Sequence, residues 1–190
     1  MADTTLTKLQ LAEQQLETAI GLFVSRRDRV SAITLAGAAD GILHGLVIKA
    51  GKQPFADYVI AMSEAMAGQT PPKAKVARHI NDQLKINDLK HMDQDDDGSV
   101  VLDVNISALG AILKAIANHH ALIPEHPDFI KAMLQWTWMF YDGKQIREDE
   151  PYQEPAGKEV MKWYGALPEH LRKAEANLAK KAQSLKPQPK

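Results

Sequence analysis

The sequence contains no cysteine, and this absence removes several kinds of chemistry at once. Disulfide bonds, thiolate metal sites and a cysteine nucleophile are all excluded. A chain of 190 residues buries enough surface to fold without covalent or metal support. We therefore expect a fold that is held together by ordinary packing and hydrogen bonding.

An excess of charge of either sign is also missing. Lys and Arg together number 23 and Asp and Glu number 24, so the formal net charge is −1. Such a balance gives the chain no overall attraction to nucleic acid or to anionic lipid. Binding to RNA stays open as the property of a local patch, but the net charge does not indicate it.

Long apolar runs and leader-like segments are lacking too. The longest apolar stretch, near residues 42–50, is interrupted by His44 and Lys49 and is too short to span a bilayer. The first five residues have neither the basic nor the apolar region of a signal peptide. Glycine-rich phosphate loops, the G-x-S-x-G motif, and helix-turn-helix and zinc-finger signatures are absent. We expect a cytoplasmic protein with no membrane contact.

Helical periodicity is the main pattern that the sequence does contain. Apolar residues recur at helical spacing in segments with the expected ranges 5–25, 29–50, 54–68, 71–91, 105–121 and 128–141. The pattern predicts an all-α fold, a helical bundle of about six core helices. Residues 1–142 are expected to form this core, and residues 143–190 a linker and a peripheral C-terminal helical arm that packs on the core and ends in a frayed tail.

Several boundaries follow from local signals. Asp28 is expected to cap the second helix, and Asn105 or Ser107 the fifth. The second helix is apolar nearly all round, which is typical of a helix in the middle of a bundle. Residues 100–104 are open to two interpretations, a short strand or an extended arm. The aromatic residues of the sixth helix, such as Trp136, favour core packing over a cofactor site.

Polar side chains on apolar helix faces are the first candidate for chemistry. Asp40 and His44 are four residues apart in the second helix, and Asn87 and His91 have the same spacing in the fourth. Burying such a group without a partner costs a free energy of roughly several kcal/mol, so each is expected to have a hydrogen-bond partner.

This polar set has two interpretations. As a catalytic site, His91 would be an acid, base or ligand, Asp40 would orient an imidazole, and Asn87 would hold a substrate or the backbone. An RNase or hydrolase built on this site would use His91 with Lys90, Asn87 and Asp40. As a structural network, the same groups would satisfy one another and fix the register of the helices. The structural interpretation is the one we favour.

The acidic loop 93–104 is the second candidate. It opens with the calcium-loop pattern D-x-D-x-D-G through Asp93, Asp95 and Asp97. The twelfth position is Val104, where a bidentate glutamate would be needed. A solvated acidic turn and a weak calcium or manganese site are the two interpretations, and no other cofactor is expected.

Three segments carry a resemblance to known proteins: Leu16–Ile20, Leu35–Asp40 and Asn87–His91. They resemble a widespread group of uncharacterised bacterial proteins with an A-A-x-x-I/V-L helix, an N-x-x-K-H-x-D segment and an acidic loop. The resemblance covers about residues 5–140 and implies common ancestry more firmly than an activity.

More distantly, the helical pattern and the Asn87…His91 spacing look like the HEPN superfamily, whose active members are RNases with an R-x4-6-H motif. Aligning His91 with that histidine places Ile86 at the arginine position, and isoleucine cannot neutralise a phosphate. The resemblance therefore implies a HEPN-like module without a complete RNase motif, a regulatory or stress-related protein that forms a homodimer or binds a protein partner. The alternatives are a His-dependent RNase or hydrolase and a divalent-ion-binding protein, so whether the chain is an enzyme stays open.

Overall fold

A computed structural model describes residues 3–68, 70–90 and 98–137 of the chain. The chain divides into two compact units, Met1–His126 and Pro127–Lys190, and each is described by itself. Within the described ranges every regular element is an α-helix, which confirms the predicted all-α fold. The expected boundary after residue 142 and the expected C-terminal arm lie outside these ranges.

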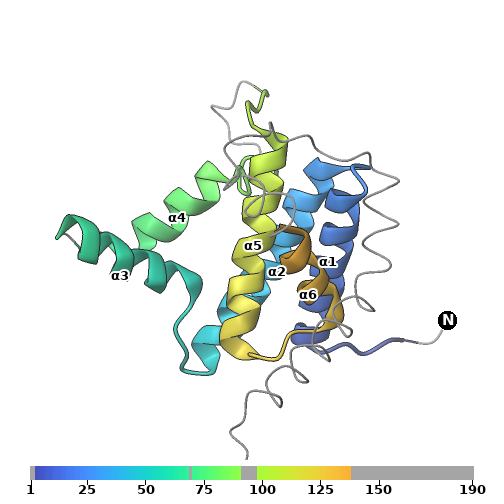
Figure 1. The fold of residues 1–190 in the computed structure, drawn as a ribbon, viewed down its shortest axis with the longest axis horizontal. Helices are drawn as coiled ribbons and strands as arrows, with labels where there is room; N and C mark the ends of the chain where they lie inside the picture. Colours follow the sequence, from blue (N-terminus) through green and yellow to red (C-terminus); the bar gives the residue numbers. More distant parts are fainter. Residues whose placement is uncertain (1–2, 69, 91–97, 138–190) are drawn as a thin grey trace, which may run out of the picture. The chain divides into compact units, whose positions relative to one another are not determined.

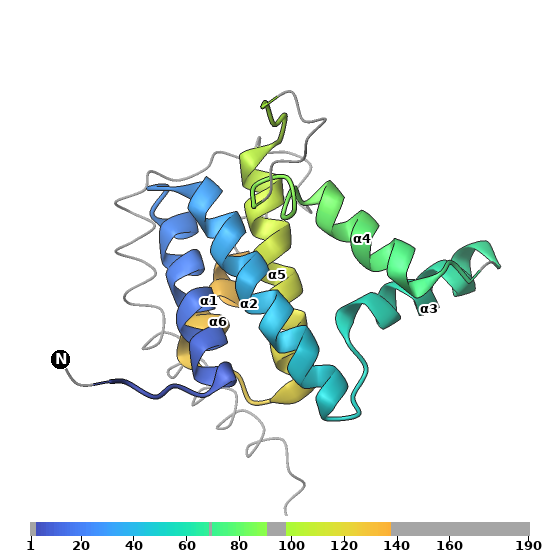
Figure 2. The ribbon, with the colours of Figure 1, turned by 180° about the vertical axis from the view of Figure 1, so that it is seen from behind.

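The core of the first unit consists of α1 (Lys8–Val24), α2 (Arg29–Lys49) and α5 (Val104–Leu122). Figures 1 and 2 show α2 lying between α1 and α5, and it packs against both along its length. The apolar stripe that the sequence predicts in α1 is buried, including Leu16, Ile20 and Phe23. Packing among these three helices forms the hydrophobic core of the unit.

Helix α2 has the central place that its all-round apolar character predicts. Its buried residues include Ile33, Ala36, Leu43 and Val47, which are 0% exposed. By length and composition alone α2 is also apolar enough to cross a membrane, a test that buried core helices of soluble proteins pass as well. As predicted, Asp28 caps the helix by accepting a hydrogen bond from the Ser31 N–H at 2.9 Å.

Helices α3 (Phe55–Ala67) and α4 (Lys73–Gln83) pack against each other, and α3 also contacts α5. Figures 1 and 2 show the C-terminal half of α3 projecting beyond α4 and away from the core helices. Gly68 ends α3 with a left-handed φ of 66°, a conformation that glycine adopts without a steric penalty. An ion pair between Lys73 and Asp57, at 2.7 Å, joins the first turns of the two helices.

The fourth helix is shorter than its sequence pattern predicts. It ends at Gln83 and not near residue 91, because Lys85 has a left-handed φ of 58° and the Ile86 N–H bonds the Asn81 carbonyl, closing a wider turn. Hydrogen-bonded turns continue through Lys90. The prediction that Asn87 lies on the apolar face of the fourth helix was therefore wrong.

The beginning of α5 also differs from the prediction. The N-cap is Asp103, which accepts hydrogen bonds from the N–H groups of Asn105 and Ile106 at 2.9 and 3.1 Å, and neither Asn105 nor Ser107 has this role. The segment before it, residues 100–103, contains no strand, and Val104 already belongs to α5, so the strand alternative was wrong. Asp103 lies two residues before the expected first residue of this helix, and its carboxylate accepts hydrogen bonds from the free N–H groups of the first turn.

The second unit is described only through α6 (Asp128–Thr137). Its Met133 and Trp136 are 0% and 1% exposed, in agreement with the prediction that the apolar residues of this segment pack in a core. Residues 138–141, which complete the expected helix, lie outside the described ranges.

Candidate functional site

A buried polar cluster joins α2 to α5. Asp40 of α2 is 6% exposed, and Lys114 and Asn118 of α5 are 8% and 1% exposed. The Lys114 ammonium donates to Asp40 Oδ2, and the Asn118 side-chain amide donates to Asp40 Oδ1 at 2.7 Å. Both carboxylate oxygens are thus engaged by groups one helical turn apart on α5.

The same groups reach the two peripheral helices. Lys114 also donates to Asn81 Oδ1 of α4 at 2.8 Å, and Asn118 Oδ1 accepts the backbone N–H of Phe55, the first residue of α3, at 2.9 Å. We call these four side chains, Asp40, Asn81, Lys114 and Asn118, the polar cluster. It connects α2, α3, α4 and α5 through charged and amide hydrogen bonds in an interior of low dielectric, where such bonds are strong and costly to leave unmade.

Lys90 approaches the polar cluster from the turn after α4. Its pKa is lowered from the ordinary value, mainly because the ammonium is partly desolvated; the nearby Asp40 carboxylate opposes this shift and the Lys114 ammonium adds to it. Gly37 of α2 makes the approach possible, because a Cβ there would lie 2.5 Å from Ile86 Cγ2 and 3.2 Å from Lys90 Nζ. Lys114 donates to Asp40 and Asn81, whereas Lys90 has no hydrogen bond to any side chain among the described residues.

The arrangement restricts what Asp40 can do chemically. A general base needs a lone pair directed at the proton that it removes. The oxygens of Asp40 instead accept from Lys114 and Asn118, and these two side chains also bond Asn81 of α4 and the Phe55 N–H of α3. This is the geometry of a satisfied structural network, with Lys90 as an adjacent cation.

The structure brings together only some of the residues predicted from the sequence. Asp40 and Lys90 are close enough to interact electrostatically. His44 follows Asp40 on α2 but is only half-buried, and among the described residues it has no hydrogen-bond partner. The side-chain amide of Asn87 donates to Asp82 Oδ1 at 3.2 Å and does not reach the polar cluster. His91 lies outside the described residues, so its role as an acid, base or ligand stays a prediction.

The predicted ion site falls in the same undescribed segment. Asp93, Asp95 and Asp97 are not among the described residues, and a calcium or manganese site there stays a prediction. Within residues 3–68, 70–90 and 98–137, no group of three His, Asp or Glu side chains is arranged to hold a metal ion.

Lys114, Asn118 and Asn81 were missed by the sequence analysis, although two of them left a signal. Lys114 follows Ala111, Ile112 and Leu113, so it interrupts an apolar run in the middle of a helix, and Asn118 follows four residues later. Two polar residues at this spacing on a helix that is otherwise apolar indicate a buried partner on a neighbouring helix. Asn81 carries no such signal, because it lies in a polar stretch of α4.

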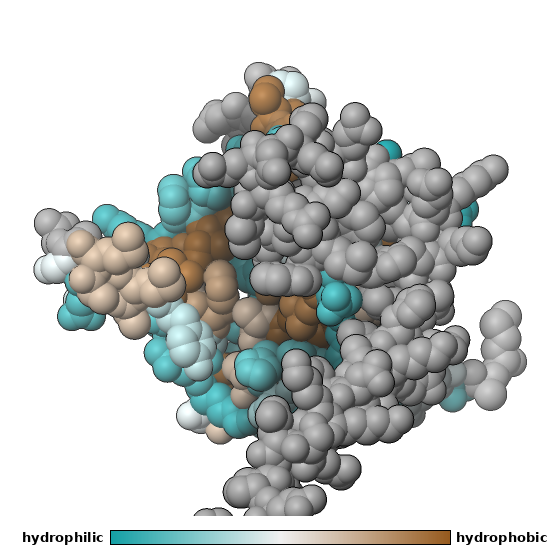
Figure 3. Space-filling model, viewed as in Figure 1, coloured by the Kyte–Doolittle hydropathy of each residue, from teal (hydrophilic) through white to brown (hydrophobic). Residues whose placement is uncertain are grey.

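A cavity of about 480 Å³ borders the polar cluster between α3, α4 and α5. Its walls are nearly all apolar, with Phe55, Ile80, Leu84 and Leu113 among them, and the stem of Lys114 forms part of one side. Figure 3 shows apolar surface in the hollow between the α3–α4 pair and α5. The size falls in the range of ligand pockets, but the one ammonium at the wall is already bound to Asp40 and Asn81.

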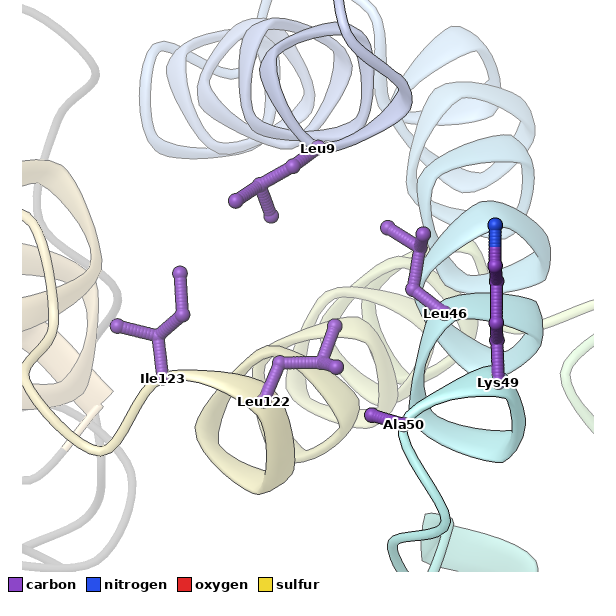
Figure 4. A pocket seen from close by; sticks show the side chains of 6 residues that line it. All are labelled: Leu9, Leu46, Lys49, Ala50, Leu122 and Ile123. Carbon is purple, nitrogen blue, oxygen red and sulfur yellow. The ribbon is translucent and has the colours of Figure 1, made fainter.

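A second cavity, of about 390 Å³, lies where the ends of α1, α2 and α5 meet. In Figure 4, Leu9, Leu46 and Ile123 direct their side chains into a shared space, and Lys49 is the only charged residue of its lining. An open apolar depression of this kind offers no group for chemistry.

One further buried polar contact belongs to the packing of α1 on α5. His119 is 0% exposed, and its Nε2 lies 3.0 Å from Glu13 Oε1. The His126 ring lies near both His119 and His120, with ring centroids 5.7 and 4.9 Å apart. These residues lie at the opposite end of α5 from its Asp103 cap and fix the packing of that end.

No family model, no curated protein and no solved structure matches the chain.

Proposed function

We propose that the chain is a non-enzymatic, HEPN-like helical module, which acts in the cytoplasm as a regulatory or stress-related protein through protein contacts. The observation that carries the proposal is that both carboxylate oxygens of Asp40 are bound by Lys114 and Asn118 within the protein. A carboxylate that is 6% exposed and bound through both oxygens fixes the helices, and it is poorly placed to take a proton from a substrate.

The engaged state of Lys114 supports the same conclusion. Cleavage of a phosphodiester requires positive charge that is free to stabilise the developing negative charge on the phosphate. Lys114 is bound to Asp40 and Asn81, and Ile86 occupies the position at which the HEPN resemblance would require an arginine. Tyr58, Met62 and Met66 of α3 are exposed apolar side chains, and they support a function through protein contacts.

A cleavage assay tests the proposal. The full chain, incubated with a fluorophore-quencher RNA, is expected to release no more signal than buffer, and His91→Ala and Lys90→Ala are expected to give the same trace. Cleavage that is lost in His91→Ala, with an unchanged melting temperature, would contradict the proposal.

A specific observation favours a second candidate, a His-dependent RNase or hydrolase that uses Lys90. Burial lowers the pKa of Lys90, and a partly desolvated amine beside a polar cluster is typical of functional sites. In this alternative Lys90 would hold an anionic substrate and His91 would transfer the proton. The same assay distinguishes the candidates, because only this one predicts turnover.

A further inference from the structure

The outward face of α3 is apolar and has no partner among the described residues. Tyr58, Met62 and Met66 are 53%, 63% and 82% exposed, and Ala61 and Ala65 between them are exposed as well. These five residues, which we call the α3 stripe, follow the i, i+3, i+4 spacing of one helix face. Large exposed apolar side chains that gather on one face mark an interaction surface far more often than isolated ones do.

Packing within the chain does not explain the stripe. Phe55 and Val59, at the start of α3, line the cavity against α4 and α5, and Ala56 is buried beside them. Met62 and Met66 follow Phe55 and Val59 by seven residues on the same face of the helix, but they are 63% and 82% exposed. Figure 3 shows apolar surface continuing over α3 where the helix projects from the core. The apolar face of α3 therefore extends farther along the helix than the contacts with α4 and α5 require.

We propose that the α3 stripe is the contact surface of a symmetric homodimer, in which α3 of one copy packs antiparallel on α3 of a second copy. This inference rests on the proposed function, because it names the protein partner as a second copy of the chain.

Charge favours a second copy as the occupant. The acidic residues of α3, Asp57 and Glu64, are seven residues apart and lie off the stripe, and Asp57 is paired with Lys73. The stripe itself carries no charge, so an identical stripe covers it without leaving a charged group buried and unpaired. With a formal net charge of −1, two copies also repel each other little.

Shape favours the same occupant. Long side chains at 58, 62 and 66 alternate with alanines at 61 and 65. In an antiparallel pair centred on Met62, Tyr58 of one copy lies opposite Met66 of the other, and the alanines leave room for the two central methionines. Large side chains packing beside small ones is the arrangement that close helix pairs require, and antiparallel helix dipoles add a favourable term.

The size of the surface sets the expected strength. A stripe of five residues on one short helix buries less than the roughly 800 Å² per partner that is typical of stable complexes. The dimer is therefore expected to be weak and to depend on concentration, with monomer prevailing in dilute solution.

Sedimentation equilibrium of the full chain over a wide concentration range tests the proposal. The average mass is expected to rise toward that of a dimer, and Met62→Lys is expected to weaken association about tenfold or more, because it places a charge in the contact. Val101→Lys is the matched control, since Val101 is 90% exposed and lies outside α3. Circular dichroism melting shows whether each variant folds.

The absence of cysteine permits an independent measurement. Met62→Cys places the only thiol of the chain at the proposed symmetry axis, and mild oxidation is expected to give a covalent dimer, whereas Ile48→Cys, on the exposed side of α2, is expected to give little. A wild-type chain that stays monomeric, or a dimer that Met62→Lys leaves intact, would overturn the inference. Either result, without RNA cleavage, leaves the proposed non-enzymatic function in place.

Discussion

Helices α2 and α3 are both rich in apolar residues, and they use these residues in opposite ways. In α2 large apolar side chains such as Ile33, Leu43 and Val47 are buried in the core with α1 and α5, and the one carboxylate among them is bound by Lys114 and Asn118. In α3 the largest apolar side chains, apart from Phe55, face outward, and Ala56 is its one fully buried residue among those whose side chains are described. The difference indicates that α2 serves the stability of the chain, and it is the basis for the proposal that α3 serves contacts beyond it.

Removing one large side chain from each helix tests whether α2 and α3 contribute differently to stability. Leu43→Ala in α2 deletes a side chain that is 0% exposed, and we expect a loss of about 2–5 kcal/mol in the free energy of unfolding. Met62→Ala in α3 is expected to change it by less than about 0.5 kcal/mol in dilute protein. Urea denaturation measures both values, and similar losses would mean that α3 is part of the core.

The tight packing behind the polar cluster is tested by two glycines of α2. Gly37→Ala would place a methyl group 2.5 Å from Ile86 Cγ2, and Ile86 is buried, so we expect a loss of about 1–3 kcal/mol. Gly41→Ala, one turn later, meets nothing within 4 Å and is expected to stabilise the helix by about 0.5–1 kcal/mol. Thermal melting of the two variants gives the signs, and two shifts of the same sign would contradict the packing described here.

The smallest expected effect concerns Lys90 and has a defined pH dependence. Because desolvation lowers its pKa in the folded state, the unfolded chain binds more protons between the lowered and the ordinary pKa, and stability rises with pH through that alkaline window. Lys90→Met is expected to remove this rise and to stabilise the chain slightly at neutral pH, since the side chain is largely exposed. Lys75→Met, at an exposed position on α4, is the control in urea titrations across pH. If the stability of Lys90→Met still rises with pH in this window, another group causes the rise.

Much of the fold could be predicted from periodicity and capping signals alone. The apolar stripe of α1, the all-round apolar α2 with its Asp28 cap, and the Gly68 end of α3 depend on neighbouring residues, and each was predictable. The end of α4 was not, because Leu84, Ile86 and Asn87 continue a helical pattern while Lys85 adopts a left-handed φ. Tertiary contacts of Ile86 against Gly37 stabilise a turn that local propensity does not indicate.

The polar cluster was also predictable only in part, because it depends on contacts between residues that are far apart in the sequence. Asp40 is conspicuous as a carboxylate on a buried helix face, so its need for partners was evident. The partners come from residues 74 and 78 positions further along the chain, and spacing within one helix gives no information about such pairs. The HEPN resemblance directed attention to Asn87 and His91, although the structure attaches Asn87 to Asp82.

The measurement that tests the account most directly is a double-mutant cycle on Asp40 and Lys114. Lys114→Met leaves a buried carboxylate short of its charged partner, and Asp40→Leu leaves a buried ammonium, so we expect each to cost about 3–5 kcal/mol in urea denaturation. The double variant replaces the pair by apolar groups and is expected to be destabilised by at least about 1 kcal/mol less than the sum of the single losses. Single losses that simply add, to within about 0.5 kcal/mol, would contradict a structural role for this pair.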